Sequence, residues 1–185
     1  SSDVCSSDLH TTTFTVPGQA EIKYNVIALR NLPYSGLIQV EVKALKDLSL
    51  QAINEMEIPN GYQQIQKRLI SANVGLDGGK EMILQTEALS AKGAQRVIAT
   101  SEYIFDHKKF NLKQENDSKN ILNASLKKGE TVTFSLVGSI CTSRDFNDPK
   151  SEAERQVIYV SYLGTERILK DHYRLWEELW KGDIE

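Results

Sequence analysis

Apolar and polar residues alternate along most of the first two thirds of the chain. Residues 20–29 place an apolar side chain at nearly every second position, and residues 37–45 repeat this pattern after a turn that contains Pro33 and Gly36. In the second run Gln39, Glu41 and Lys43 alternate with Ile38, Val40, Val42 and Ala44. A period of two is typical of β-strands with one buried face, and proline and glycine favour a turn between them. These residues therefore predict two strands.

The same alternation and its interruptions predict a series of further strands. Residues 48–53 are expected to continue the second strand, and the more polar residues 62–70 are typical of a strand at a sheet edge. The remaining strands are predicted at 81–89, 97–105, 121–126 and 131–140, and glycines mark the turns before the first, second and fourth of them. The highly charged residues 106–119 are expected to form a solvated loop. Short strands at regular spacing with such turns predict an antiparallel β-sandwich.

The period changes at Asp148, where two helices are predicted to begin. Asp148 is suited to cap the N-terminus of a helix, and Pro149 is suited to its first position. Gly164 is expected to end the first helix, which covers residues 149–163, and Thr165 is expected to cap the second helix, which runs to residue 181. The sequence thus predicts a mainly β fold, an antiparallel β-sandwich followed by two C-terminal α-helices.

The second predicted helix carries a wide apolar stripe that includes both tryptophans of the chain. Its members recur at helical spacing and are Ile168, Leu169, His172, Tyr173, Trp176, Leu179 and Trp180. Large aromatic side chains at this spacing favour packing between structural elements over stacking on a sugar ring, which is the alternative. We therefore expect interdomain packing against a further part of a longer protein, through Ile168, His172, Trp176, Leu179 and Trp180.

Three segments of the chain resemble one known family. They are ALRNLPYSGLIQVEVKAL at residues 28–45, VGSICTSRDFNDPKSEAERQVIY at residues 137–159, and the pattern H-x3-W-x2-LW-x2-DI-E at residues 172–185. Because the three segments occur in the family's order, residues 14–185 resemble the N-terminal β-domain of glycoside hydrolase family 65. The last of the three resembles the linker that joins this domain to the catalytic barrel of the family.

The resemblance implies a galactose-mutarotase-like supersandwich that is truncated at its start. The family contains hydrolases and phosphorylases of α-glucosides, such as maltose, trehalose and kojibiose phosphorylases. Its general acid is a glutamate in a downstream (α/α)6 barrel, so we expect no catalytic, cofactor-binding or metal-binding residue in this chain. The resemblance also implies that the domain packs on its own barrel, supports the shape of the active site and contributes to a possible homodimer, with an α-glucoside as the substrate of the parent enzyme.

Composition and charge are those of an ordinary globular domain, with 40% hydrophobic residues, 25% charged residues and a net charge of −3. No basic patch indicates a nucleic-acid partner, and no apolar run in the sequence has the length of a membrane span. The first nine residues, SSDVCSSDL, resemble translated sequencing adapter. We therefore expect a non-native segment at 1–9, a β-sandwich domain at 10–147, and a helical linker at 148–185 toward a missing barrel. The compartment, cytoplasmic or periplasmic, is left open.

Few side chains are candidates for chemistry of their own. Asp145 and Asp148 could form a carboxylate pair or half of a calcium site, although a helix cap with a turn is favoured. Cys141 follows an apolar strand and is expected to be a small buried residue. His172 is expected to donate a structural hydrogen bond from the apolar stripe. The chain has three histidines, His10, His107 and His172. Their spacing is not that of a zinc-binding pattern.

Two functional hypotheses follow. The first is a non-catalytic N-terminal domain of a carbohydrate-active enzyme that acts on α-glucosides, by hydrolysis or by phosphorolysis. The alternative is a freestanding carbohydrate-binding or protein-interaction module. Four tyrosines could line a carbohydrate face, namely Tyr24, Tyr34, Tyr62 and Tyr103, although core or edge packing suits Tyr24 and Tyr103 equally well.

Overall fold

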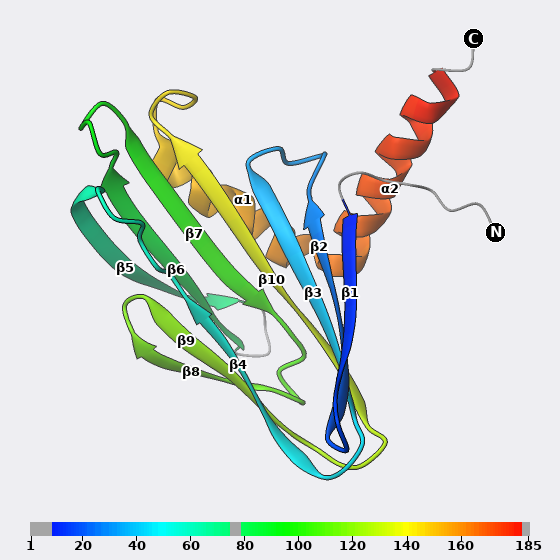
Figure 1. Ribbon diagram of the computed structural model, residues 1–185. Helices are drawn as coiled ribbons and strands as arrows, with labels where there is room; N and C mark the ends of the chain where they lie inside the picture. The colour runs from blue at the N-terminus through cyan, green and yellow to red at the C-terminus, as the bar shows by residue number, and fades with distance from the viewer. Residues whose placement is uncertain (1–8, 75–78, 183–185) are drawn as a thin grey trace.

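The computed structural model describes residues 9–74 and 79–182, which fold mainly into β-strands (Figure 1). The strands are β1 (Leu9–Val16), β2 (Ala20–Ala28), β3 (Ser35–Ala44), β4 (Leu48–Glu55), β5 (Gln63–Val74), β6 (Gly79–Leu89), β7 (Arg96–Ile104), β8 (Asn111–Asn116), β9 (Lys119–Leu126) and β10 (Thr131–Thr142). Two helices follow, α1 (Pro149–Leu163) and α2 (Thr165–Gly182).

The strands form two antiparallel sheets that pack face to face. The large sheet has seven strands in the order β1-β2-β3-β10-β7-β6-β5, and the small sheet has three in the order β4-β9-β8. Figure 1 shows α1 lying behind the large sheet, on the face opposite the small sheet. The large sheet is therefore the middle of three layers. This arrangement confirms the predicted antiparallel sandwich with two C-terminal helices, and β5 is an edge strand as predicted.

A hydrophobic core fills the space between the two sheets. Alternate residues of a strand face the same side, so Leu122, Ala124 and Leu126 of β9 all point inward. They belong to the same buried cluster as Val42 of β3 and Phe134 of β10. The period of two in the sequence thus marks the residues that join the sheets.

A second core lies between the large sheet and the helices. Ile27 of β2 and Val137 of β10 meet Val157 of α1 and Ile168 of α2, and each of these side chains is at most 1% exposed. Because β10 contributes to both cores, its residues are buried on alternate faces. α1 begins where the sequence predicts, since the Asp148 side chain accepts a hydrogen bond from the backbone N–H of Ser151 at 3.1 Å.

The turn predicted between β9 and β10 carries the chain from one sheet to the other. Gly129 has a φ of 85°, a left-handed conformation that glycine adopts without strain. Its backbone N–H donates to the carbonyl of Ala44 at 2.7 Å, and the Ala44 N–H donates to the carbonyl of Glu130 at 2.9 Å. The turn is therefore held against the end of β3 as the chain leaves the small sheet for the large one.

Three details of the predicted elements are wrong, and β1 was not predicted. Residues 106–119, expected as a solvated loop, contain β8, and Phe110 just before it is 5% exposed in the inter-sheet core. Charged residues of this edge strand face solvent, so the sequence as a whole looks like a solvated loop although alternate residues face inward. Residues 48–53 do not continue β3, because β4 belongs to the other sheet. Thr165 begins α2 but its hydroxyl donates to the Ser135 hydroxyl at 2.9 Å rather than capping the helix.

We expect Ile168→Ala to lower the free energy of unfolding by about 3 kcal/mol, because Ile168 is fully buried between α2 and the large sheet. Urea denaturation followed by circular dichroism measures the change. Tyr162→Ala is the matched control, since Tyr162 on α1 is 79% exposed and its loss is expected to change stability by no more than about 0.5 kcal/mol. Equal effects of the two substitutions would contradict the described packing of α2.

Candidate functional site

The apolar stripe of α2 begins on the sandwich itself. Ile168 and His172 are both fully buried, and Ile168 packs in the core beneath the large sheet. The backbone N–H of Arg30 donates to Nδ1 of His172 at 3.2 Å. One turn further along, the Arg30 guanidinium lies 4.4 Å from the centre of the Trp176 ring. Arg30, in the turn between β2 and β3, thus contacts two successive turns of α2.

These contacts change the interpretation of the residues predicted to pack against another domain. Ile168 and His172 are fully buried within this domain, so neither side chain has exposed surface that could contact another domain. His172 takes part in a structural hydrogen bond, which its Nδ1 accepts from the backbone N–H of Arg30. Trp176 is half-buried, and the predicted contacts of the Leu179 and Trp180 side chains lie outside the described residues. The periodicity placed Ile168, His172 and Trp176 along one side of α2 but could not show which surface covers them.

The two carboxylates before α1 have separate local partners. Asp148 caps the helix, and hydrogen bonds from Ser151 lower the pKa of its carboxyl group. Asp145 accepts a hydrogen bond from the Thr142 hydroxyl at 2.8 Å. The helix-cap interpretation is therefore confirmed. Within the described ranges, no group of three or more His, Cys, Asp or Glu side chains has the arrangement of a metal site.

The histidines and the cysteine outside α2 are dispersed. His10 is exposed on β1 and forms a 3.1 Å hydrogen bond with Thr12. His107 is exposed and its ring centre lies 4.5 Å from that of Phe105. Cys141 is fully buried on the helix side of β10, as predicted, and burial raises the pKa of its thiol to about 11. None of these groups is placed to act with another in catalysis.

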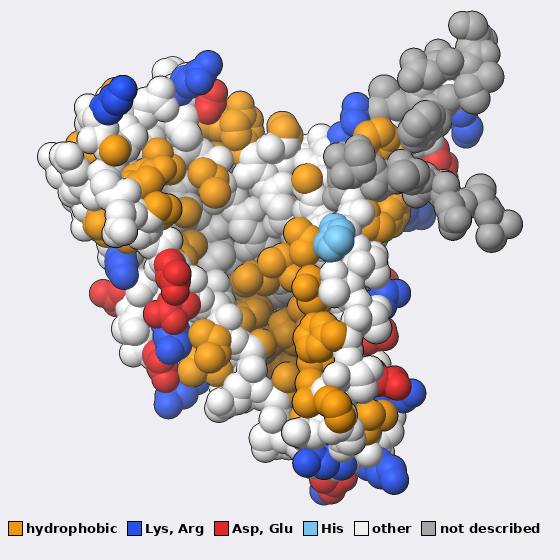
Figure 2. Space-filling view, in the orientation of Figure 1, with side chains coloured by type: hydrophobic (Ala, Val, Ile, Leu, Met, Phe, Trp, Pro, Cys, Tyr) orange, Lys and Arg blue, Asp and Glu red, His pale blue; other side chains and the backbone are white. Residues whose placement is uncertain are grey.

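A cleft of about 580 Å³ lies on the inner face of the large sheet, beside the small sheet. Figure 2 shows apolar side chains gathered in a hollow on this side of the molecule. Val26, Ile38 and Ile140 line the cleft and are 40%, 37% and 59% exposed. In the sequence these apolar residues alternate with polar ones, which is the pattern of a buried strand face. The sequence therefore could not show that the small sheet leaves them uncovered.

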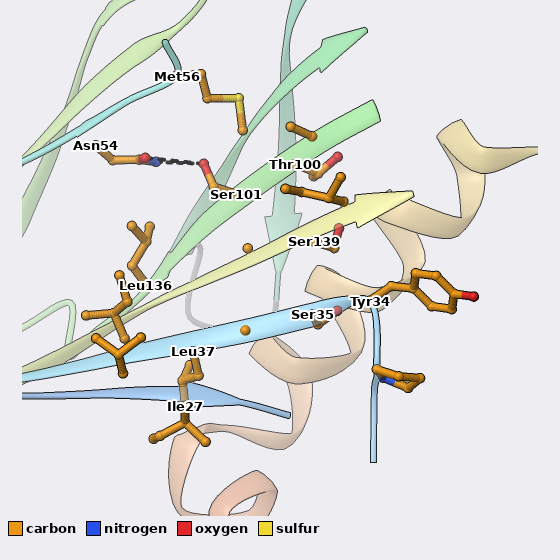
Figure 3. Close-up of a pocket in the computed structure, with 17 residues that line it drawn as sticks. Ile27, Tyr34, Ser35, Leu37, Asn54, Met56, Thr100, Ser101, Leu136 and Ser139 are labelled. Carbon is orange, nitrogen blue, oxygen red and sulfur yellow. Dashed lines mark hydrogen bonds between the residues drawn. The ribbon is translucent and has the colours of Figure 1, made fainter. Parts of the chain in front are cut away.

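The cleft offers apolar walls and few polar groups. At one end the side-chain amide of Asn54 donates to the hydroxyl of Ser101 at 2.9 Å, as Figure 3 shows. At the other end Tyr34 packs edge-on against Phe146, with ring centres 4.8 Å apart. Among the described residues, no carboxylate, histidine or lysine lines the cleft, so this lining has no acid–base pair for glycoside chemistry.

The four tyrosines do not form one carbohydrate face. Tyr103 is 5% exposed and packs in the inter-sheet core, 6.0 Å from the ring centre of Phe134. Tyr24 pairs with Phe14 on the outer strands of the large sheet at 6.0 Å. Only Tyr34 lines the cleft, and the cleft lining includes neither Tyr62 nor the other two. The core interpretation of Tyr103 is therefore correct.

Comparison with known proteins identifies the family. Residues 10–179 match the family model described as "Glycosyl hydrolase family 65, N-terminal domain". The chain belongs to this family. The resemblance seen in its three sequence segments is thereby confirmed for the family 65 N-terminal domain.

Relatives of this family 65 domain are much longer than the chain. It is 33% identical over 184 residues to a kojibiose hydrolase of Mucilaginibacter mallensis, with 95% of the chain and 27% of that enzyme covered. A kojibiose hydrolase of Flavobacterium johnsoniae is 29% identical, with 95% and 26% covered. A solved structure described as a putative kojibiose phosphorylase from the human microbiome shares the fold, with a TM-score of 0.59, 12% identity, and 91% and 23% coverage.

The chain therefore spans about a quarter of the length of the curated relatives it matches. In the part of the family 65 domain that the structure describes, no helix has both the length and the apolar character needed to cross a membrane.

We expect the Cys141 thiol to resist modification in the folded domain. A pKa of about 11 in place of about 9 lowers the thiolate fraction at pH 8 by about a hundredfold, and full burial slows access further. Titration with a chromogenic disulfide reagent, in a Cys5→Ser background, measures the rate before and after unfolding in guanidinium. Rapid reaction of the folded protein at pH 8 would contradict the buried position.

Proposed function

We propose that this chain is the non-catalytic N-terminal domain of an enzyme that hydrolyses or phosphorolyses an α-glucoside. The proposal rests mainly on one observation: nearly the whole chain matches about a quarter of two kojibiose hydrolases. The described residues support it, because the carboxylates near α1 are engaged in helix capping and turn formation and the cleft lining holds no carboxylate. Catalysis is then performed by a part of the parent enzyme outside this chain.

We further propose that the C-terminal turns of α2 connect this domain to the catalytic barrel. α1 and the first turns of α2 are integral to the sandwich, because Val157, Val160 and Ile168 are fully buried against it. The end of α2 projects away from the sheets in Figure 1. Tyr173 and Trp176, in the turns that lead toward this end, are 38% exposed and half-buried respectively. The segment that we propose connects to a barrel is therefore shorter than the linker predicted at residues 148–185.

The isolated chain is expected to show no activity on kojibiose, maltose or trehalose, with or without phosphate. Glycoside cleavage needs a general acid and a positioned nucleophile or base. Asp145 and Asp148 are engaged in a turn and a helix cap, and the described lining of the cleft contains no carboxylate. Release of glucose or glucose 1-phosphate is measured, with the full parent reading frame as the positive control. Turnover by the chain that is lost in Asp145→Asn or Asp148→Asn would contradict the proposal, and an inactive parent frame would favour a binding module.

In the parent enzyme, we expect Trp176→Ala to lower stability by about 2 kcal/mol, less than a fully buried tryptophan because Trp176 is only half-buried. The ratio of kcat/KM values for kojibiose and maltose is expected to stay unchanged. Thermal unfolding and initial rates measure the two quantities. Tyr162→Ala, at an exposed position of α1, is the control. A changed substrate ratio with unaltered stability would show that Trp176 stacks on sugar.

A further inference from the structure

The inner face of the small sheet changes from apolar to polar along its strands. On β4, the inward series Leu48, Leu50 and Ala52 ends in Asn54, and on β9 the series from Leu126 to Leu122 ends in Asn120. Asn54 lies directly opposite Asn120, and Asn120 lies directly opposite Gln114 of β8. Because opposite residues in antiparallel strands share a face, these three amides form one row across the sheet. We call it the amide row.

Two of the three members of the amide row are buried, and the side chain of the central one, Asn120, has no hydrogen-bond partner among the described residues. Asn120 is 0% exposed and Asn54 is 6% exposed. Both Oδ1 and Nδ2 of Asn120, and Oε1 of Gln114, are buried without a hydrogen-bond partner among the residues that the structure describes. Burial of an amide with no hydrogen-bond partner is unfavourable, so such groups in folded proteins are normally satisfied.

The chemistry of the unpaired atoms indicates the ligand. Asn120 presents a donor and an acceptor together, and this holds for either orientation of its amide. Water supplies both functions at one site, whereas a metal ion could bind the amide oxygens but would leave the N–H donors without a partner. The amide row also contains no carboxylate to balance the charge of a cation. We propose that the amide row is an internal water-binding site between the two sheets.

The position of Asn54 connects this site with the cleft. Asn54 donates to Ser101 of β7 and accepts from the same hydroxyl, at 2.9 Å and 3.3 Å, and both residues line the cleft (Figure 3). Water that enters the cleft therefore reaches one end of the amide row. A water molecule at Asn120 would continue the link from Ser101 across the small sheet and fix the small sheet's polar end against the large one.

The sign of a stability change tests the proposal. Asn120→Leu keeps a similar volume and removes the donor and the acceptor, so the loss of bound water is expected to lower the midpoint of thermal unfolding by roughly 4–8 °C. Asn111→Leu is the matched control: Asn111 lies on the neighbouring strand β8, is exposed, and faces the other side of the sheet. The control is expected to shift the midpoint by about 2 °C at most. A higher midpoint for Asn120→Leu would overturn the proposal.

A second measurement on the unsubstituted chain does not depend on how a variant folds. A high-resolution crystal structure is expected to show ordered water within about 3 Å of both amide atoms of Asn120. Cross-relaxation between water and the Asn120 side-chain amide protons, in ¹⁵N-labelled protein, is expected to accompany it. Electron density in which only protein atoms surround this amide would overturn the proposal, whatever the midpoints of the variants are.

Discussion

The central part of the large sheet must be covered on both faces, and much of the remaining structure follows from this requirement. Its central strands carry apolar side chains on each side, with Val132 and Phe134 facing the small sheet and Val137 and Cys141 facing the helices. Leaving either face in water would forfeit about 25 cal/mol for each Å² of apolar surface. The small sheet and α1 are therefore needed together, and the C-terminal helices belong to the domain as much as its strands do.

Hydrogen bonds fix how α1 lies on the sheet. The face beneath it is not purely apolar: the hydroxyl of Ser35 donates to Gln156 at 2.5 Å, and the hydroxyl of Ser139 donates to the carbonyl of Ala153 at 2.8 Å. These buried polar groups would be costly if unpaired, so they are satisfied only when the helix stands at one position along β3 and β10. Apolar burial attaches α1 to the sheet, and these bonds specify its placement.

Local sequence patterns predicted where helices and strands form better than they predicted which of these elements pack together. Asp148, Pro149 and Gly164 set the bounds of α1, because capping and backbone geometry depend only on neighbours in the chain. Alternation located most strands, but a period of two identifies a buried face without showing what covers it. The sequence therefore did not assign β4 to the second sheet, and it did not show that Val26 and Ile140 stay uncovered.

For the same reason, the sequence did not show what packs against the apolar stripe of α2. A stripe of Ile168, His172 and Trp176 predicts a large partner surface, and the turn between β2 and β3 supplies part of it through Arg30. The backbone of Arg30 holds His172 while its guanidinium lies over Trp176, so one residue of the sandwich sets the angle at which α2 leaves it. The direction of the helix is then a property of the β-domain, because buried contacts at its first turns orient the turns that extend beyond the sheets.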